Sequence, residues 1–237
     1  RPERHNALSA QMMDELSEAA RRLGEDSSVR VVILAAEGES FCAGGDLGWM
    51  REQMRADAAQ RAREARRLAD MLGLLDRLPK PLIGRVHGNA FGGGIGMMSV
   101  CDVAVGARSA KFGLTETKLG LIPATIGPYV LARMGEDKAR RVFFSARLFG
   151  ADEAVTLNLA ARAVAPDDLD AALREVFTVF RRDLEKYEAD VERALGRTPA
   201  AQHEFDAAVS FHFNTGAIAR AAWVDLWKRG QKADAAR

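Results

Sequence analysis

The stretch His87-Gly88-Asn89-Ala90-Phe91-Gly92-Gly93-Gly94-Ile95-Gly96-Met97-Met98 is the most informative part of this 237-residue chain. The apolar residues Leu82, Ile83 and Val86 before it predict a strand, and the apolar run over residues 97–101 predicts a helix. Glycine is costly inside regular structure, so clustered glycines indicate backbone that must lie close to another group. The stretch therefore predicts a strand, a turn and a helix whose first N–H groups face a ligand.

A shorter loop earlier in the chain, Phe41-Cys42-Ala43-Gly44-Gly45-Asp46-Leu47, repeats this pattern after the buried-strand run Val31-Val32-Ile33-Leu34. Two loops of this kind can aim two backbone N–H donors at one oxygen atom, which is the arrangement of an oxyanion hole. Together they predict a site that stabilises a developing negative charge.

The composition, with 48% hydrophobic residues, is that of one large globular domain or a domain with an appendage. A net charge of +1 neither favours nor excludes an anionic partner. Cys42 and Cys101 form no disulfide framework, and no apolar run or signal peptide indicates a membrane. We expect a cytoplasmic protein without a membrane partner. The chain starts abruptly at Arg1, and we expect a strand upstream of this sequence.

Several motifs of other enzyme classes are absent from the sequence. The dinucleotide fingerprint fails because Met97 stands where its third glycine is needed, and no Lys-Ser or Lys-Thr follows the glycines as in a P-loop. There is no Gly-x-Ser-x-Gly elbow and no cluster with metal-ligand spacing, so no metal site is expected.

The order of expected elements is that of an α/β fold with a helical C-terminal third. Helices are expected from Ser9 to Gly24 and over residues 47–78, 129–134, 137–145, 152–157 and 169–195, with strands over 29–36, 82–86, 102–106, 111–112 and 163–164. Residues 196–199 are the best candidate hinge before further helices.

A series of motifs in this order resembles the crotonase family, also called the enoyl-CoA hydratase/isomerase superfamily. The motifs are Pro2-x-x-x-Asn6-Ala7-Leu8, Phe41-Cys-Ala-Gly-Gly-Asp46, Pro81-Leu-Ile, His87-Gly, Gly92-Gly-Gly94, Cys101-Asp102, Phe112-Gly-x-x-Glu116, Leu119-Gly-Leu-Ile-Pro123 and Gly150-Ala-x-Glu153-Ala. The resemblance implies a spiral of β-β-α units over residues 1–165 and a helical trimerisation region over residues 166–237. It also implies acyl-CoA substrates, no cofactor beyond the coenzyme A of the substrate, and a homotrimer or a hexamer built as a dimer of trimers.

The same resemblance implies the site residues. The oxyanion donors would be the backbone N–H groups of Gly45 and Gly93, and Glu116 would be the catalytic acid and base. Substrate would be bound by Ala43, Gly45, Asp46, Leu47, Gly48, Gly92, Gly93 and Thr125. From the residues alone, Asp46 is equally a helix N-cap, and Thr125 is equally a turn residue beside Pro123.

Gly96 departs from the typical hydratases of this family, which carry a first catalytic glutamate at this position. Hydration of an enoyl thioester is natural for two carboxylates, whereas moving a double bond from C3 to C2 needs one base. Gly96 thus favours an isomerase or an atypical hydratase. The wider motifs around Trp49, Gly94-Ile-Gly96 and residues 115–130 resemble bacterial methylglutaconyl-CoA and isohexenylglutaconyl-CoA hydratases, in which the same glycine occurs.

We therefore predict syn hydration of a 2-enoyl-CoA, with 3-methylglutaconyl-CoA as the candidate substrate. The alternatives are a Δ3-Δ2-enoyl-CoA isomerase and a non-catalytic homologue that binds acyl-CoA or RNA. Acidic residues dilute the arginines of residues 51–67, so a solvated helix face is the better interpretation there and a nucleic-acid partner is not expected. Cys42 and Cys101 are expected to be small buried residues, and His87 to be structural.

Overall fold

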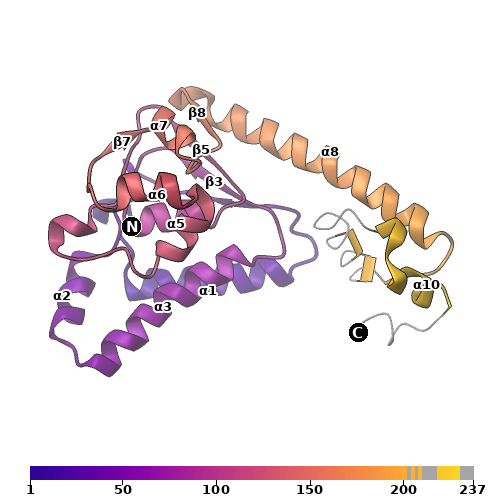
Figure 1. Cartoon of the computed structure of the whole chain (residues 1–237), viewed down its shortest axis with the longest axis horizontal. Coiled ribbons are helices and arrows are strands. Elements are labelled where there is room, and N and C mark those ends of the chain that lie inside the picture. Colours follow the sequence, from indigo (N-terminus) through magenta and orange to yellow (C-terminus); the bar gives the residue numbers. More distant parts are fainter. Residues whose placement is uncertain (202–203, 206–207, 210–217, 230–237) are drawn as a thin grey trace. The chain divides into compact units, whose positions relative to one another are not determined.

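The computed structural model describes residues 1–201, 204–205, 208–209 and 218–229 (Figure 1). The chain divides into two compact units, Arg1–Leu173 and Arg174–Arg237, and each is described by itself. The predicted division at residue 165 lies shortly before the start of the long helix α8 (Leu169–Leu195). None of the described helices is long and apolar enough to cross a membrane.

The first unit holds two four-stranded sheets that are built by successive turns of the chain. One sheet has the order β1-β3-β5-β8, with parallel pairing throughout. The other has the order β2-β4-β6-β7, parallel except for the antiparallel pair β6 and β7. Their bounds are β1 Val32–Leu34, β2 Ser40–Cys42, β3 Leu82–Val86, β4 Asn89–Phe91, β5 Val103–Ala107, β6 Lys111–Gly113, β7 Phe149–Gly150 and β8 Arg162–Val164.

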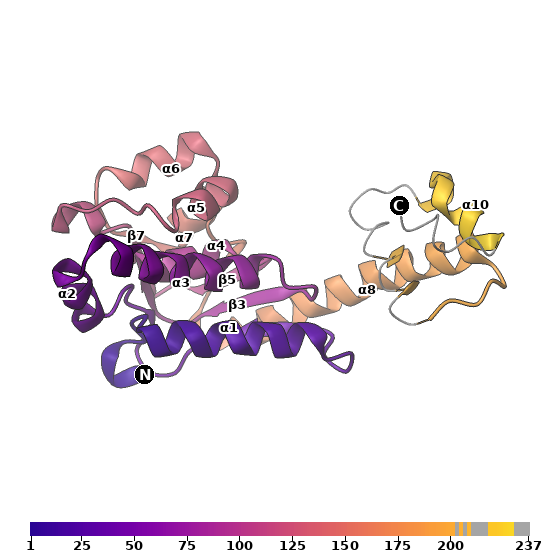
Figure 2. The same cartoon turned by 90° about the horizontal axis from the view of Figure 1, so that it is seen from below.

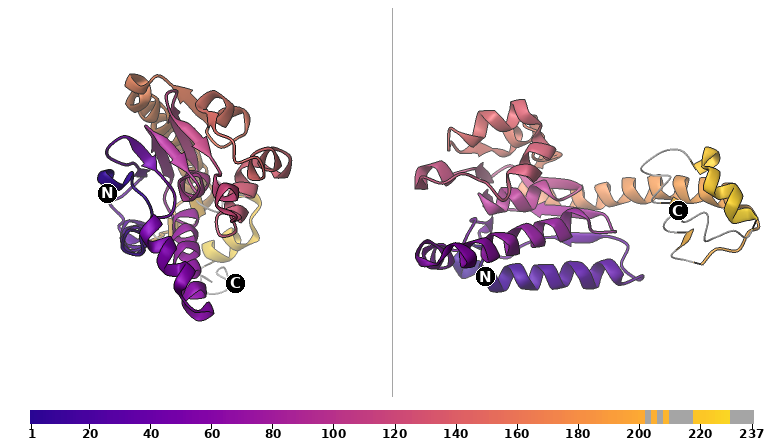
Figure 3. Two further views of the ribbon diagram at one scale, coloured as in Figure 1. Left: turned by 90° about the vertical axis from the view of Figure 1, so that its left-hand side faces the viewer. Right: turned by 60° about the horizontal axis from the view of Figure 1, so that its bottom comes forward.

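Each of the first three turns gives one strand to each sheet, and the strands of one turn pair with those of the next, as in β1-β3-β5 and β2-β4-β6. Such repeated β-β-α turns stack into a spiral, and the predicted α/β fold is confirmed. Figure 3 shows the strands of the sheets in the interior, with helices outside them. The helices and 3-10 turns of this unit are η1 Pro2–Arg4, α1 Ala10–Glu25, α2 Leu47–Arg55, α3 Ala58–Asp76, α4 Gly93–Ser99, η2 Glu116–Leu119, α5 Gly127–Met134, α6 Glu136–Phe143, α7 Ala151–Thr156 and η3 Pro166–Asp168.

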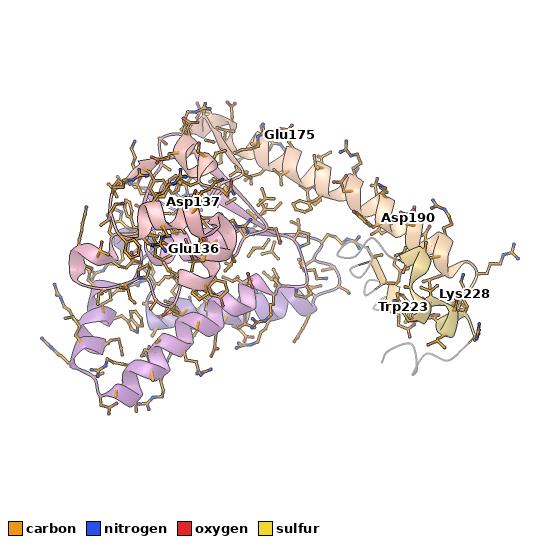
Figure 4. The ribbon with its side chains drawn as sticks, in the orientation of Figure 1. Glu136, Asp137, Glu175, Asp190, Trp223 and Lys228 are labelled. Atoms are coloured by element: carbon orange, nitrogen blue, oxygen red, sulfur yellow. The ribbon has the colours of Figure 1, made fainter. Side chains whose placement is uncertain are left out.

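Local signals set the ends of several helices. The Ser9 hydroxyl accepts a hydrogen bond from Met12 N at 3.2 Å and caps α1, which lies alongside α3 (Figure 2). Glu136 and Asp137 lie in the first turn of α6 (Figure 4), where negative charge complements the helix dipole. The core between the sheets and helices includes Phe112 and Phe149, whose ring centroids lie 5.9 Å apart.

Three details of this unit differ from the expectations. The single helix expected over residues 47–78 is broken into α2 and α3, because Ala56 is extended and Asp57 caps a new helix by accepting from Gln60 N. The sheet containing β2, β4 and β7 was not expected, and β1 is shorter than the run over residues 29–36. Strands of two or three residues contain too few side chains to show an alternating pattern.

The second unit contains most of α8, the 3-10 turn η4 (Ile218–Arg220) and α10 (Ala222–Lys228). An apolar cluster holds it together, comprising Val191, Leu195, Ala208, Val209, Ile218 and Val224. The rings of Trp223 and Trp227 lie 5.9 Å apart in an edge-on arrangement, and Figure 4 labels Trp223 on α10. Helix α8 ends at Leu195, where the hinge was predicted, and Gly196 follows with φ of 62°.

Candidate active site

The first glycine loop follows β2 and is held by Leu8, which belongs to the Asn6-Ala7-Leu8 motif. Leu8 N donates to Gly44 O at 2.7 Å, and Asp46 N donates to Leu8 O at 2.9 Å. These two hydrogen bonds form an isolated parallel β-bridge between Leu8 and Gly45. In such a bridge the residue between the two bonds turns its own N–H and C=O away from the partner strand. The Gly45 N–H therefore points away from Leu8.

The two glycine loops are pressed against each other. A Cβ atom built on Gly44 would lie 3.0 Å from Phe91 O and 3.6 Å from Gly93 N. Gly44 also has φ of +92°, a conformation that L side chains rarely adopt. The Leu8 side chain packs under the second loop, because a Cβ atom on Gly93 would lie 2.7 Å from Leu8 Cδ1. Glycine at these positions is thus required for the contact between the loops.

The second loop ends as the start of α4. Gly92, with φ of +47°, is the N-cap, and its carbonyl oxygen accepts from Ile95 N and Gly96 N. In the part of the chain that the structure describes, no backbone hydrogen bond uses the N–H of Gly45 or of Gly93. Both N–H groups are therefore available to an external acceptor next to the junction of the two loops.

The far end of α4 is anchored by Arg133 from α5. Its guanidinium donates to Ser99 O at 3.1 Å, to Asp102 O at 3.2 Å and to Cys101 O. A cation at a helix C-terminus satisfies free carbonyl groups and complements the helix dipole. Arg133 thereby fixes the helix whose first turn presents Gly93.

Glu116, the first residue of η2, lies against the glycine turn. A Cβ atom on Gly92 would lie 3.1 Å from Glu116 Oε1. Glu116 Oε2 is buried and has no hydrogen-bond partner among the described residues. Burial raises the pKa of Glu116, and the hydrogen bond from its own backbone N–H opposes this in part. A half-buried carboxylate with one unpaired oxygen, beside two free N–H donors, is suited to proton transfer next to a bound carbonyl.

The position of the missing carboxylate is filled by an apolar side chain. A Cβ atom on Gly96 would lie 2.6 Å from Ile126 Cγ2 and 3.0 Å from Ile126 Cβ, with Leu72 Cδ1 at 3.8 Å. Ile126 is buried and precedes α5, and its neighbour Thr125 is half-buried. The space beside Gly96 is therefore occupied by the isoleucine side chain.

The remaining predicted substrate-binding residues lie on or beside the first loop. Asp46 Oδ1 accepts from Gly48 N at 2.8 Å and from Trp49 N at 3.1 Å, so the N-cap interpretation describes it. The hydrogen bond from Trp49 N is the largest cause that lowers the pKa of Asp46, and the Arg1 guanidinium adds to it at 3.0 Å. Ala43 N donates to His5 O at 2.9 Å, and Leu47 is exposed.

Three other residues singled out in the sequence have structural places. The His87 ring nitrogen Nε2 lies 2.8 Å from Gly38 O. Cys42 and Cys101 are buried, and burial raises the pKa of the two thiols to about 11 and about 12. Among the described residues, no group of three histidine, cysteine or acidic side chains is placed to hold a metal ion. A surface cavity of about 430 Å³ lies by α5 and α6, away from these loops, and is lined by Leu131, Glu136, Arg140, Phe143 and Phe144.

Trp49 and Glu64 were not recognised as site residues in the sequence, yet Trp49 lies beside the first loop and Glu64 is hydrogen-bonded to Trp49. A Cβ atom on Gly45 would lie 3.7 Å from Trp49 Cζ3, and the Trp49 indole donates to Glu64 Oε2 at 2.9 Å. Glu64 is buried, although it belongs to the arginine-rich helix that was expected to be a solvated face. The available signal was its spacing, because Glu64 precedes Leu68 and Met71 on the apolar stripe at helical intervals.

Comparison with known proteins agrees with this geometry. The family model described as "Enoyl-CoA hydratase/isomerase" matches residues 1–215, and the chain belongs to that family. The chain is 36% identical over 183 residues to the enoyl-CoA hydratase ACTT6 of Alternaria alternata, covering 76% of this chain and 59% of that protein. It is 37% identical over 147 residues to the enoyl-CoA hydratase AKT6-1 of the same organism, covering 62% and 47%. The matches thus span about half the length of these curated relatives.

Solved structures give the same assignment. AtuE of Pseudomonas aeruginosa superimposes with a TM-score of 0.76 and 32% identity, covering 100% of this chain and 93% of that chain. An enoyl-CoA hydratase from Shewanella pealeana gives a TM-score of 0.76 and 31% identity, covering 98% and 88%. The resemblance to the crotonase family is therefore confirmed.

Proposed function

We propose that this chain acts on acyl-CoA thioesters and catalyses the reversible syn addition of water to a 2-enoyl-CoA. The observation that carries the proposal is the Glu116 carboxylate, with its unpaired oxygen Oε2, beside the glycine turn and next to the free N–H groups of Gly45 and Gly93. The proposal needs no metal or further cofactor. Its finer parts are 3-methylglutaconyl-CoA as the substrate and a homotrimer or a dimer of trimers as the assembly.

In the proposed mechanism, the two backbone N–H groups stabilise charge and Glu116 moves the proton. As the water oxygen attacks C3, negative charge develops on the thioester oxygen, and the N–H groups of Gly45 and Gly93 stabilise it. Loss of one such donor typically costs about 3 kcal/mol of activation free energy. Glu116 removes the proton from the attacking water and then delivers it to C2. Because one carboxylate does both, the hydroxyl group and the proton add to the same face.

The raised pKa of Glu116 suits this double task. Burial is the main cause of the rise, and it favours the protonated form that must exist between the two proton transfers. A fully solvated glutamate would be a weaker base at neutral pH. The position of Glu116 is thus more useful for proton transfer than for substrate anchoring.

Glu116→Gln tests the assignment. We expect turnover of the preferred 2-enoyl-CoA to fall by about 10³-fold or more, while binding of a non-hydrolysable acyl-CoA thioether stays within about threefold. The matched control is Glu52→Gln, an exposed glutamate on α2, which should retain full turnover. Substrate identity is tested by mass spectrometry with crotonyl-, 3-methylglutaconyl-, isohexenylglutaconyl- and 3-enoyl-CoA. Full activity of Glu116→Gln would refute the proposal.

Isomerisation of a 3-enoyl-CoA to a 2-enoyl-CoA is the second candidate. Ile126 against Gly96 favours it, since the site then offers one carboxylate where hydratases of the typical kind use two. Glu116 would remove a proton from C2 and return it to C4. Turnover in H₂¹⁸O separates the two reactions, because hydration places ¹⁸O in the product and isomerisation does not. Oligomeric state is measured by light scattering on the same samples.

A further inference from the structure

Glu64 is a buried acidic side chain that the proposed reaction does not use. It lies on α3 with 6% of its surface exposed. One oxygen, Oε2, accepts the Trp49 indole N–H at 2.9 Å and lies 3.2 Å from Arg67 Nε. The other, Oε1, accepts from Gln60 Nε2 at 3.2 Å and from Arg67 at 3.3 Å. Both oxygens therefore have partners, and Arg67 balances the charge.

A buried carboxylate with this arrangement is costly to remove or to leave unpaired. Withdrawal of an ion from water costs several kcal/mol unless hydrogen bonds and an opposite charge compensate it. Hydrogen bonds to a charged acceptor are stronger than neutral ones, so the bond from Trp49 is also more strongly oriented. Arg67 has a second carboxylate partner, Asp14 of α1, which offers a natural control.

The opposite edge of the Trp49 ring lies beside Gly45, together with Met50, whose Sδ atom would be 3.2 Å from a Cβ atom on Gly45. The Trp49 Cζ3 atom is 3.7 Å from the place where a Cβ atom would stand on Gly45. Helix α2, which carries Trp49, has nine residues and none that is fully buried. A helix this short is marginal without tertiary contacts, so its position depends on anchors such as the Asp46 cap and the Trp49 side chain.

We propose that Glu64 is a positioning residue: it fixes the Trp49 indole against Gly45, so that the ring walls the acyl-thioester pocket and keeps water from the Gly45 N–H. This inference rests on the proposed function and deepens it. Exclusion of water by the ring strengthens a hydrogen bond from the Gly45 N–H to developing charge, because water no longer competes for the donor. The acyl-thioester group of the substrate would thus contact an aromatic surface on the side of the Gly45 donor.

Kinetics separate this role from a merely structural one. In Glu64→Ala we expect kcat to fall by about tenfold or more with KM changed by less than about threefold, since the lost effect acts on the developing charge. Glu64→Gln keeps an oxygen that accepts the indole N–H, so kcat should stay within about threefold of wild type. Asp14→Asn removes the negative charge of the other partner of Arg67 and should leave kcat within about twofold.

Trp49→Phe tests whether Glu64 acts through the indole. This variant keeps an aromatic ring but has no N–H to donate. In the Trp49→Phe background, Glu64→Ala should change kcat by less than about twofold, which is the non-additivity expected of groups that act as a unit. An equal loss of kcat in both backgrounds would overturn the proposal. If Glu64→Ala folds poorly, Trp49→Phe alone tests the contact, because it removes the same hydrogen bond from the indole side.

A spectroscopic measurement gives a result that does not depend on turnover. The chain has three tryptophans, and ¹⁹F NMR of protein containing 5-fluorotryptophan identifies the Trp49 resonance as the one lost in Trp49→Phe. We expect Glu64→Ala to shift or broaden that resonance, and Glu64→Gln and Asp14→Asn to leave it in place. An unchanged resonance in Glu64→Ala would overturn the inference. Absence of any enoyl-CoA turnover by the wild-type protein would instead refute the proposed function, so the two failures are distinguishable.

Discussion

The contact between Gly96 and Ile126 yields the sharpest prediction about this site. Gly96 lies inside α4, where alanine would normally be the better residue. Here a Cβ atom would lie 2.6 Å from Ile126 Cγ2, which is closer than real Cβ contacts come. We therefore expect Gly96→Ala to destabilise the fold, and Ile126→Ala to relieve that effect.

The magnitudes follow from the opposing contributions. Replacement of a helical glycine by alanine gains about 1 kcal/mol, whereas overpacking costs about 1–3 kcal/mol. Because the contact is so close, we expect Gly96→Ala to lower the free energy of unfolding by a net amount of about 1–2 kcal/mol. Ile126→Ala should cost about 3 kcal/mol by opening a cavity. The double variant should lose only about 2 kcal/mol, because the new methyl group enters that cavity, so the coupling between the sites is about 2 kcal/mol or more.

Urea unfolding followed by far-UV circular dichroism measures these free energies, at one protein concentration for all variants. The control is Gly127→Ala in α5, where a Cβ atom would meet Phe143 Cε1 at an ordinary 3.9 Å. That variant should be at least as stable as wild type, because no overpacking offsets the gain in helix propensity. If Gly96→Ala were as stable as wild type, or if the coupling were below about 0.5 kcal/mol, the packing argument would be refuted.

Three further predictions concern Glu116, two glycines and a helix cap. Because burial raises the pKa of Glu116, the folded state holds this proton more tightly than the unfolded state, and the carboxyl lowers stability as pH rises above its usual value of 4.5. The unfolding free energy of Glu116→Gln should therefore exceed that of wild type by a margin that grows from pH 4 to pH 8. The acid limb of the wild-type kcat/KM profile should lie above pH 4.5. A stability margin that is equal at all pH values would contradict this reasoning. Gly88→Ala should cost about 3 kcal/mol in urea unfolding, since its Cβ would lie 2.2 Å from Glu39 O, whereas Gly120→Ala, with φ of +70° and open space, should cost about 1 kcal/mol. Asp46→Ala should lower the free energy of unfolding by about 1–2 kcal/mol in the same assay. The Asp46 carboxylate accepts hydrogen bonds from two backbone N–H groups at the start of α2, and the variant removes that acceptor.

Local signals in the sequence were enough to predict much of the fold. Ser9 and the apolar spacing after it located α1, and the glycine loops located the two turns that face each other. These features depend on cap chemistry and backbone conformation, which a few adjacent residues determine. The break between α2 and α3 was missed because Asp57 is one polar residue in a polar run, and its role as a cap is visible only in the folded chain.

The composition of the site was less predictable than its backbone. Gly45, Gly93 and Glu116 were selected from the sequence, and the structure brings their loops together, although their catalytic roles stay predictions. The side chain that fills the space at Gly96 was not predictable, since Ile126 comes from a later turn of the spiral. Glu64 was missed because an acid among arginines resembles a surface residue, and only its burial distinguishes it.

The isoleucine packed beside Gly96 also bears on how Glu116 titrates. Gly96 lies one helical turn from Gly92, whose position touches the Glu116 carboxylate, and one turn rises about 5.4 Å. A second carboxylate on Gly96 would lie close enough to raise the pKa of Glu116 by like-charge repulsion. With isoleucine there, burial alone is the leading cause of the raised pKa. Burial therefore sets the raised proton affinity of Glu116, the carboxyl that the proposed mechanism uses to take a proton and return it on one face.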